Sequence, residues 1–337
     1  MKNDPYKKAG VDIKAGNDLV NKIKKDVAST FDKNVLGNLG SFSGFYSLPK
    51  GYKDPVLVAC TDGVGTKVAL AQKNSSLNSI GQDLVAMCVN DMVTSGARPL
   101  FFLDYFASSK LKVDDTVKVI KGVATACKKS NCSLIGGETA EMPNHYIGKN
   151  FDLAGFSVGI VEKKLIIDPS KVKKNNIIIG IESSGAHSNG YSLINKLIEE
   201  SNLSKSDRQK LTKLALKPTH LYTMVILDLV KKIKVKSIAN ITGGGLKENI
   251  PRSIPDHLST EIYLDNWKIP PLFKYLQKLG KIHLDDMLRI FNCGIGMTVV
   301  VDSRDLDGTM KILSKHGFKG FMIGKVVKNL TKKINFI

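Results

Sequence analysis

The sequence has no long apolar segment and none of the cysteine spacings that mark metal sites. No window approaches the roughly 18 uncharged apolar residues that a membrane-spanning helix needs. The opening residues, MKNDPYKKAGVD, lack the apolar core of a signal peptide. The five cysteines are scattered, without the close C-x2-C pairs of zinc sites. We therefore expect a cytoplasmic protein with reduced thiols and no membrane partner.

Arginine is scarce, although the net charge is +19. Five of the 50 basic residues are arginine, and the lysines are spread in ones and twos along the chain. Proteins that read nucleic acids depend on arginine forks and interleaved aromatic side chains. The composition therefore argues against a nucleic-acid partner, while the positive charge would attract small anions. A basic, non-enzymatic binding protein is the alternative, and its nucleic-acid affinity would fall steeply with salt.

The length of 337 residues suits two domains of about 150 residues each. Short runs rich in Val, Ile and Leu alternate with longer amphipathic runs, which indicates an α/β or α+β fold. The charged segment 162–176 contains an Asp-Pro break. This break predicts a boundary between an N-terminal domain, 1–167, and a C-terminal domain, 168–337.

The same patterns predict individual elements. Strands are expected at residues 56–60, 99–107, 133–135, 152–161, 177–181, 236–241 and 297–301. Helices are expected at residues 15–28, 80–96, 114–130, 192–200, 221–233 and 270–279.

The stretch VLVACTDGVGTKVALA has a glycine-rich turn between two apolar runs. Gly63 and Gly65 let backbone N–H groups approach an anion, and Lys67 would neutralise it. The turn is not a Walker A loop, because Thr66 separates Gly65 from Lys67. An aspartate beside a phosphate needs a cation between them, so Asp62 is a candidate Mg²⁺ ligand. An Asp-Gly turn with a surface lysine explains this stretch equally well.

Two further acidic groups lie close to apolar segments. The helix within residues 80–97 is apolar nearly all round, yet it carries Asp83, Asn90 and Asp91. Buried carboxylates need a metal or hydrogen bonds as compensation, and capping or salt bridging is the alternative. In LIGGETAEMP, Glu138 follows a strand and two glycines, where it would lie at the carboxyl edge of a sheet.

The second half has two glycine-rich loops, ESSGAHSNGYSL and NITGGGLKENIPR. The first carries His187, Ser188 and Asn189, and the second has three consecutive glycines, 243–245, before a helix. Helix N-termini behind such loops bind anions readily. His187 is a candidate base or hydrogen-bond donor, with a surface or capping histidine as the alternative.

Taken together, these segments resemble the aminoimidazole ribonucleotide synthetase family, also called phosphoribosylformylglycinamidine cyclo-ligases. The matching runs follow the family's order from about residue 6 to residue 324. They are YKKAGVDIKAGN, PVLVACTDGVGTK, GQDLVAMCVNDMVTSGARPLFFLDYFA, CSLIGGETAEMP, DLAGFSVGIVEK, SSGAHSNGYSL, ITGGGLKENIPR and FNCGIGM.

The resemblance implies a fold, a partner and a reaction. Each half would be an α/β domain, and the N-terminal sheets of two subunits would pair into a shared barrel in a homodimer. The reaction would be the ATP-dependent ring closure of formylglycinamidine ribonucleotide to 5-aminoimidazole ribonucleotide, with release of ADP and phosphate, in purine biosynthesis. The cofactors implied are ATP and Mg²⁺, with K⁺ as a further candidate ion.

The resemblance also implies the metal ligands. Across the wider superfamily, an aspartate of the TDG loop and one of the ND-containing helix hold Mg²⁺ on the ATP phosphates. These positions are Asp62 and Asp91 in this sequence. Glu138 is expected as a third ligand and Asp83 as a fourth.

The remaining expected contacts involve ATP or the ribose phosphate of the substrate. Lys67 and Lys7 are expected at the ATP phosphates, and Lys67 and His187 are the expected catalytic residues. The other expected ligand-binding residues are Gly63, Val64, Gly65, Thr66, Asn90, Ser188, Asn189, Gly243, Gly244 and Gly245.

Another ATP-dependent member of the same superfamily is the alternative function. A selenophosphate synthetase or a thiamine-phosphate kinase would lack GGETAEMP and HSNGYSL in this form. A selenophosphate synthetase would also carry a reactive Cys or selenocysteine near its N-terminus, whereas the first cysteine here is Cys60.

Overall fold

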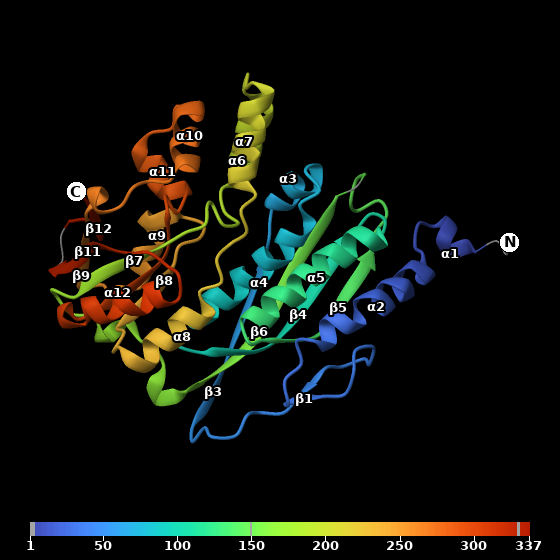
Figure 1. Cartoon of the computed structure of the whole chain (residues 1–337), viewed down its shortest axis with the longest axis horizontal. Coiled ribbons are helices and arrows are strands. Elements are labelled where there is room, and N and C mark those ends of the chain that lie inside the picture. Colours follow the sequence, from blue (N-terminus) through green and yellow to red (C-terminus); the bar gives the residue numbers. More distant parts are fainter. Residues whose placement is uncertain (1–3, 149, 329–330) are drawn as a thin grey trace. The chain divides into compact units, whose positions relative to one another are not determined.

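A computed structural model describes residues 4–148, 150–328 and 331–337. The chain divides into two compact units (Figure 1). The first comprises Met1–Met92 and Pro99–Glu162, and the second comprises Val93–Arg98 and Lys163–Ile337. The division thus falls after Glu162, and a short segment at the end of one helix groups with the second unit.

The first unit is a four-stranded sheet with helices on one face. The strand order is β3-β6-β4-β5, with β3 and β6 antiparallel and β4 and β5 parallel. A two-stranded ribbon, β1-β2, lies outside this sheet. The elements are α1 (Pro5–Lys8), α2 (Ile13–Ala28), β1 (Val35–Leu36), β2 (Phe45–Tyr46), β3 (Pro55–Gly63), α3 (Lys67–Lys73), α4 (Leu77–Val93), β4 (Arg98–Ser108), α5 (Val113–Lys129), β5 (Ser133–Glu141) and β6 (Phe151–Glu162).

Helices α4 and α5 pack closely against each other (Figure 1). A Cβ at Gly81 of α4 would fall 2.3 Å from the backbone nitrogen of Val123 in α5. A Cβ at Gly122 of α5 would fall 2.1 Å from the backbone oxygen of Asn78 in α4. Only glycine allows the two backbones to approach this closely.

Strand alternation decides which side chains face these helices. A Cβ at Gly155 of β6 would contact Phe102 of β4 and Leu84 of α4. These positions therefore face the helices, and their neighbours along each strand face the other way. Asp62 is the register partner of Gly155, so it also lies on the helical face.

The opposite face of this sheet, which we call the open face, carries large apolar side chains. Tyr105 is 40% exposed and Phe156 is 38% exposed. Phe156 pairs with Thr61, and Leu57 lies four residues before Thr61 on the same face, with 56% exposure. Glu138 pairs with Tyr105 and thus also lies on the open face.

The second unit is a six-stranded sheet with order β12-β9-β11-β7-β10-β8. Its neighbouring strands are antiparallel except for the parallel pair β12 and β9. Its elements are η1 (Lys163–Leu165), η2 (Pro169–Lys171), β7 (Ile177–Glu182), α6 (Tyr191–Glu200), α7 (Lys205–Ala215), α8 (Thr223–Lys232), β8 (Ser237–Asn240), α9 (Gly245–Arg252), β9 (Leu258–Ile262), η3 (Leu264–Asn266), α10 (Pro271–Gly280), α11 (Leu284–Ile290), β10 (Ile295–Val301), η4 (Ser303–Asp305), α12 (Leu306–Lys315), β11 (Gly320–Lys328) and β12 (Ile334–Phe336).

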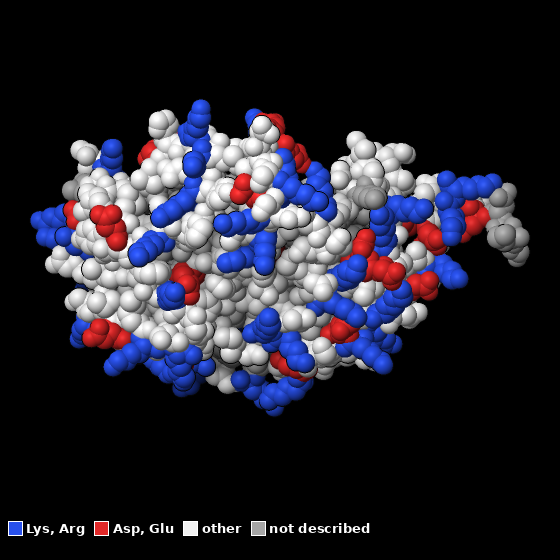
Figure 2. Space-filling model, turned by 45° about the horizontal axis from the view of Figure 1, so that its top comes forward, with Lys and Arg blue, Asp and Glu red and all other residues white. Residues whose placement is uncertain are grey.

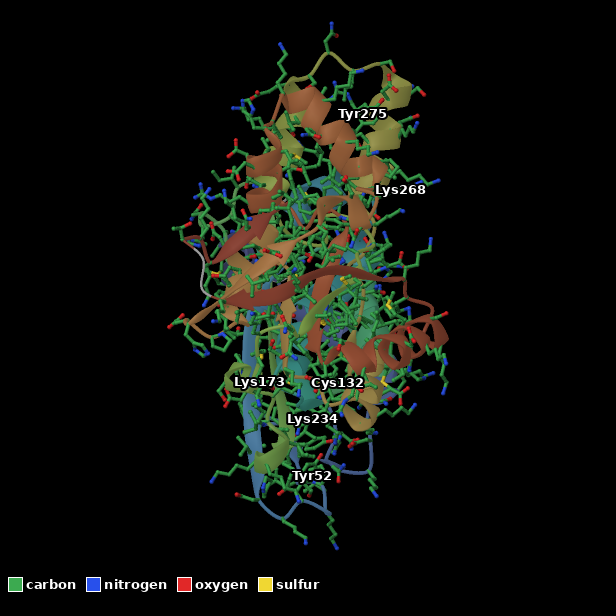
Figure 3. The ribbon with its side chains drawn as sticks, turned by 90° about the vertical axis from the view of Figure 1, so that its left-hand side faces the viewer. Tyr52, Cys132, Lys173, Lys234, Lys268 and Tyr275 are labelled. Carbon is green, nitrogen blue, oxygen red and sulfur yellow. The ribbon has the colours of Figure 1, made fainter. Side chains whose placement is uncertain are left out.

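An apolar core joins α8 and α12 to this second sheet. Ile226 and Leu229 of α8 and Leu313 of α12 pack with Ile179 of β7 and Val299 of β10, and all five are fully buried. Outside this core, α10 lies beside α7, where the Tyr275 hydroxyl donates a hydrogen bond to Asp207 at 2.9 Å (Figure 3). The two-domain α/β fold predicted from the sequence is thus confirmed, whereas a barrel across a dimer stays a prediction.

The distribution of basic side chains and the lengths of the helices bear on the predictions about nucleic-acid and membrane partners. Basic side chains are scattered over the face seen in Figure 2 and do not form one stripe. Within the described residues, no helix is both long and apolar enough to pass through a bilayer.

Candidate functional site

The turn after β3 places Asp62 at the end of a strand and beside α4. The Asp62 carboxylate is half-buried and accepts a hydrogen bond from the backbone N–H of Gly63 at 2.7 Å. Burial raises the pKa of Asp62, and the charge of Asp91 raises it further, against the lowering effect of the Gly63 hydrogen bond. Asp91 lies near the end of α4 and is exposed. The fold therefore brings the two predicted metal ligands close enough for their charges to oppose each other.

Lys67 and Asp83 lie in the interior and pair with each other. Lys67 Nζ is 2.8 Å from Asp83 Oδ1, and both side chains are 0% exposed. Burial lowers the pKa of Lys67, and Asp83 opposes that effect. The phosphate contact expected for Lys67 and the metal contact expected for Asp83 stay predictions beside this ion pair. The salt-bridge alternative that the sequence left open for Asp83 is what the structure shows.

Glu138 lies apart from Asp62 within one chain. It is on β5, whereas Asp62 is on β3, and these strands form opposite edges of the sheet. Three strand spacings separate the edges by about 14 Å. The two side chains also lie on opposite faces. In the described ranges, no three His, Cys, Asp or Glu side chains are grouped as a metal site. A cluster of all four predicted ligands is therefore not formed within a single chain.

The other predicted residues of the first unit are spread over three places: Gly65 and Thr66 in the turn after β3, Asn90 on α4 and Lys7 on α1. Gly65 has a φ of +66°, which favours glycine, and α3 begins directly after Thr66. Asn90 is buried in α4 beside Asp91. Lys7 lies on α1, is exposed, and forms an ion pair with Asp12 at 2.5 Å. The contacts of Gly65, Thr66, Asn90 and Lys7 with ATP stay predictions.

The two glycine-rich loops of the second unit meet at one edge of its sheet. Strands β7 and β8 are both antiparallel to β10, so they run parallel to each other and end at the same edge. The loop with Ser188 and Asn189 follows β7, and the loop 243–245 follows β8. A Cβ at Gly243 would lie 3.6 Å from Asn189 Oδ1, which shows that the loops are adjacent. Their backbone N–H groups at the starts of α6 and α9 suit an anion.

Two asparagines, Asn249 and Asn292, shape these loops through their side-chain hydrogen bonds. The buried side chain of Asn249 donates hydrogen bonds to the backbone oxygens of Gly243 at 2.9 Å and Gly245 at 2.8 Å. Asn292 accepts a hydrogen bond from the Ser183 hydroxyl at 3.0 Å and donates one to the Gly185 oxygen at 2.8 Å. The sequence signal for the Asn249 contacts is its position four residues after Gly245, the last glycine of the loop 243–245.

His187 is buried, not on the surface. It is 2% exposed and has a φ of +58°. Its ring centroid lies 6.0 Å from that of Tyr222 and 6.3 Å from that of His220. A Cβ at Gly296 would fall 2.4 Å from His187 Cε1, so that glycine makes room for the ring. The proton-transfer role of His187 stays a prediction.

Solved structures of known proteins have the same fold as the whole chain. The thiamine-monophosphate kinase of Stenotrophomonas maltophilia has a TM-score of 0.70 at 14% identity, over 94% of this chain and 95% of that protein. A hydrogenase maturation protein HypE, solved in complex with ATP, has a TM-score of 0.70 at 14% identity, over 95% and 90% of the two chains. T. maritima PurL complexed with AMPPCP has a TM-score of 0.58 at 14% identity, over 94% of this chain but 45% of that one.

Family models match both halves of the sequence. The model for the N-terminal domain of AIR synthase related proteins matches residues 48–161, which lie in the first unit. The model for the C-terminal domain matches residues 173–335, in the second unit. The chain therefore belongs to the AIR synthase-related proteins, a superfamily of ATP-using enzymes.

Proposed function

We propose that this chain catalyses the ATP-dependent ring closure of formylglycinamidine ribonucleotide to 5-aminoimidazole ribonucleotide. The observation that carries the proposal is the opposed pair Asp62 and Asp91 beside a glycine-rich turn. Family membership supports the use of ATP, and HypE and PurL bind ATP or its analogue AMPPCP in the solved structures. The long sequence runs shared with aminoimidazole ribonucleotide synthetases support the particular substrate.

The Asp62 and Asp91 carboxylates fit a magnesium ion. Mg²⁺ prefers oxygen ligands and is commonly held by one or two carboxylates together with phosphate oxygens. The mutual repulsion that raises the pKa of Asp62 would be relieved by a cation between the two groups. When bound there, the ion would neutralise charge on the ATP phosphates. Asp62 would be held in place by the Gly63 hydrogen bond.

The proposed chemistry needs positioning more than covalent catalysis. The formyl oxygen of the substrate takes the terminal phosphoryl group of ATP, ADP leaves, and the formamide nitrogen loses its proton as a carbon–nitrogen double bond forms. The amine nitrogen of the substrate then attacks the formyl carbon, the carbon–oxygen bond breaks, phosphate leaves with the oxygen, and the nitrogen loses a proton. The glycine-rich loops at the starts of α6 and α9 would hold an anionic group of a reactant.

A substrate panel tests this proposal. We expect purified protein with Mg²⁺ and ATP to release ADP when formylglycinamidine ribonucleotide is added, and to leave ATP intact when thiamine monophosphate is added instead. The measurement is a coupled assay for ADP, with product identified by mass spectrometry. ADP release with thiamine monophosphate alone would replace the cyclo-ligase proposal with the kinase alternative.

The open face of the first sheet supports a homodimer. Leu57, Tyr105 and Phe156 expose apolar surface on that face, and a second copy would remove it from water. We expect Leu57→Asp combined with Phe156→Asp to convert a dimer into a monomer in sedimentation velocity experiments. Leu165→Asp, at another exposed apolar residue outside this sheet, serves as the control and should leave the dimer intact. A wild-type protein that sediments as a monomer would remove the dimer from the proposal.

A further inference from the structure

One side chain at the end of β5 joins two segments that are distant from it in the sequence. Glu141 Oε2 accepts a hydrogen bond from the backbone N–H of Asp12 at 2.6 Å, and Glu141 Oε1 accepts one from the backbone N–H of Leu111 at 2.7 Å. Asp12 is the N-cap of α2, and Leu111 directly precedes Lys112, the N-cap of α5. Hydrogen bonds to a carboxylate are stronger than those to a neutral acceptor. Glu141 therefore fixes the starts of both helices to the end of β5.

The N-terminal segment 4–12 lies against the same end of β5. Its helix α1 has no buried residue, and Figure 1 shows α1 at the edge of the unit, beyond the start of α2. Gly10 has a φ of +100°, which favours glycine, and a Cβ there would fall 2.9 Å from side-chain carbons of Pro143. The segment thus packs on Pro143 and is hydrogen-bonded to Glu141, two residues earlier. These two contacts hold the segment in place.

Lys7 of α1 forms an ion pair within this segment. Its Nζ lies 2.5 Å from Asp12 Oδ2, and 63% of the lysine side chain is exposed. The hydrogen bond and the charge of Asp12 raise the pKa of Lys7, and the charges of Asp4 and Glu141 raise it further, so the lysine stays protonated. Exposed ion pairs contribute little free energy, so an anionic ligand can replace the carboxylate. Asp12 would stay in place, because it also accepts a hydrogen bond from the N–H of Ala15 at 3.2 Å.

We propose that Glu141 is a positioning residue, which holds the N-terminal segment where Lys7 can exchange the carboxylate of Asp12 for a phosphate group of ATP. The inference rests on the proposed function, because that function supplies the ATP. Glu141 itself would contact neither ATP nor the substrate. A lysine on a loose segment loses conformational freedom when it binds, and an anchor lowers this cost. Loss of the anchor should therefore weaken the binding of ATP through Lys7.

Two variants of Glu141 and one matched control test this role in the full-length protein. Glu141→Ala removes both acceptor oxygens. Glu141→Gln keeps one acceptor, so it can serve Asp12 or Leu111 but not both. The control is Glu162→Ala at the end of β6, because Glu162 also accepts hydrogen bonds from two backbone N–H groups, those of residues 53–54, at 2.9 and 3.0 Å. Its partners precede β3 and lie outside the N-terminal segment.

Hydrogen exchange in the free protein measures the anchor without any ligand. We expect Glu141→Ala to speed amide exchange in peptides that cover residues 10–16 by roughly 10- to 100-fold, because the N–H of Asp12 loses a charged acceptor. Glu141→Gln should lie between this variant and wild type, and Glu162→Ala should exchange like wild type in these peptides. Exchange in residues 10–16 that is equal in Glu141→Ala and wild type would overturn the inference.

Calorimetric titration with a non-hydrolysable ATP analogue and Mg²⁺ measures the effect on Lys7. We expect Lys7→Met and Glu141→Ala each to weaken the analogue by roughly 10-fold, the loss of a hydrogen bond to a charged group. The double variant should be no weaker than Lys7→Met alone, because Glu141 acts through Lys7. Glu141→Gln should recover part of the lost affinity, and Glu162→Ala should bind like wild type. Losses that multiply in the double variant, or wild-type affinity in Lys7→Met, would refute the role of Glu141.

Neither measurement needs turnover, so the inference can be separated from the proposed reaction. Analogue binding that depends on Glu141 in a protein that never closes the ring would contradict only the proposed reaction. Ring closure by a protein whose analogue affinity is the same in wild type, Lys7→Met and Glu141→Ala would contradict only the role of Glu141.

Discussion

Replacing Asp83 with asparagine should destabilise the first unit by about 3–5 kcal/mol at neutral pH, because Lys67 would then be a buried charge without its ion-pair partner. For a unit of about 150 residues, this corresponds to a fall in Tm of roughly 10 °C. Thermal unfolding measures the fall in Tm, and urea unfolding measures the loss in the free energy of unfolding. Lys67→Met combined with Asp83→Leu is the matched control, since an apolar pair of similar volume should recover most of the lost stability.

The pH dependence of the same variant gives a second check. Burial lowers the pKa of Lys67 below its ordinary value of 10.5, and in the variant the opposing effect of Asp83 is weakened. The unfolded chain then binds more protons than the folded chain, so stability rises with pH up to about pH 10, by at most about 1.4 kcal/mol per unit. An Asp83→Asn protein as stable as wild type at pH 7 would show that the ion pair contributes nothing to the fold.

Replacing Asp91 with asparagine should lower the rate of ADP release by roughly 100- to 1,000-fold, about 3–4 kcal/mol of transition-state stabilisation. The reason is that Asp91 would supply one of two carboxylates to the magnesium ion. Asp91 is exposed, so the folded state should survive the change. The measurement is the coupled ADP assay with saturating substrate, accompanied by a Tm.

Asp114→Asn is the matched control for this prediction. Asp114 is an exposed aspartate on α5 whose partner is the surface residue Lys22, 2.8 Å away. We expect the Asp114→Asn protein to release ADP at the same rate as wild type. Equal rates for Asp91→Asn and wild type would exclude Asp91 from the site.

Much of the sheet and helix framework around the site could be predicted from apolar periodicity. The strand predicted at 56–60 is observed as β3, Pro55–Gly63, and the helix predicted at 80–96 is observed as α4, Leu77–Val93. The strand predicted at 133–135 is too short, because two adjacent glycines, Gly136 and Gly137, indicate an end that the structure does not have there. In the structure these glycines pair with Leu103 and Asp104 of β4, and β5 continues to Glu141.

The ion pair of Lys67 with Asp83 could not be predicted from the local sequence of Lys67. A lysine two residues after a glycine pair resembles a phosphate-binding lysine. Its partner Asp83 lies 16 residues away on another helix, and only the packing of α3 and α4 brings the two together. A single aspartate within an apolar strand likewise gives no sign of the cavity that Asp104 lines in the first unit.

The most direct test of the magnesium assignment is calorimetric titration of a non-hydrolysable ATP analogue, with and without Mg²⁺. The account predicts that wild-type protein binds the analogue much more tightly with Mg²⁺, and that Asp62→Asn combined with Asp91→Asn removes this gain. Magnesium-dependent binding that is unchanged in the double variant would contradict it.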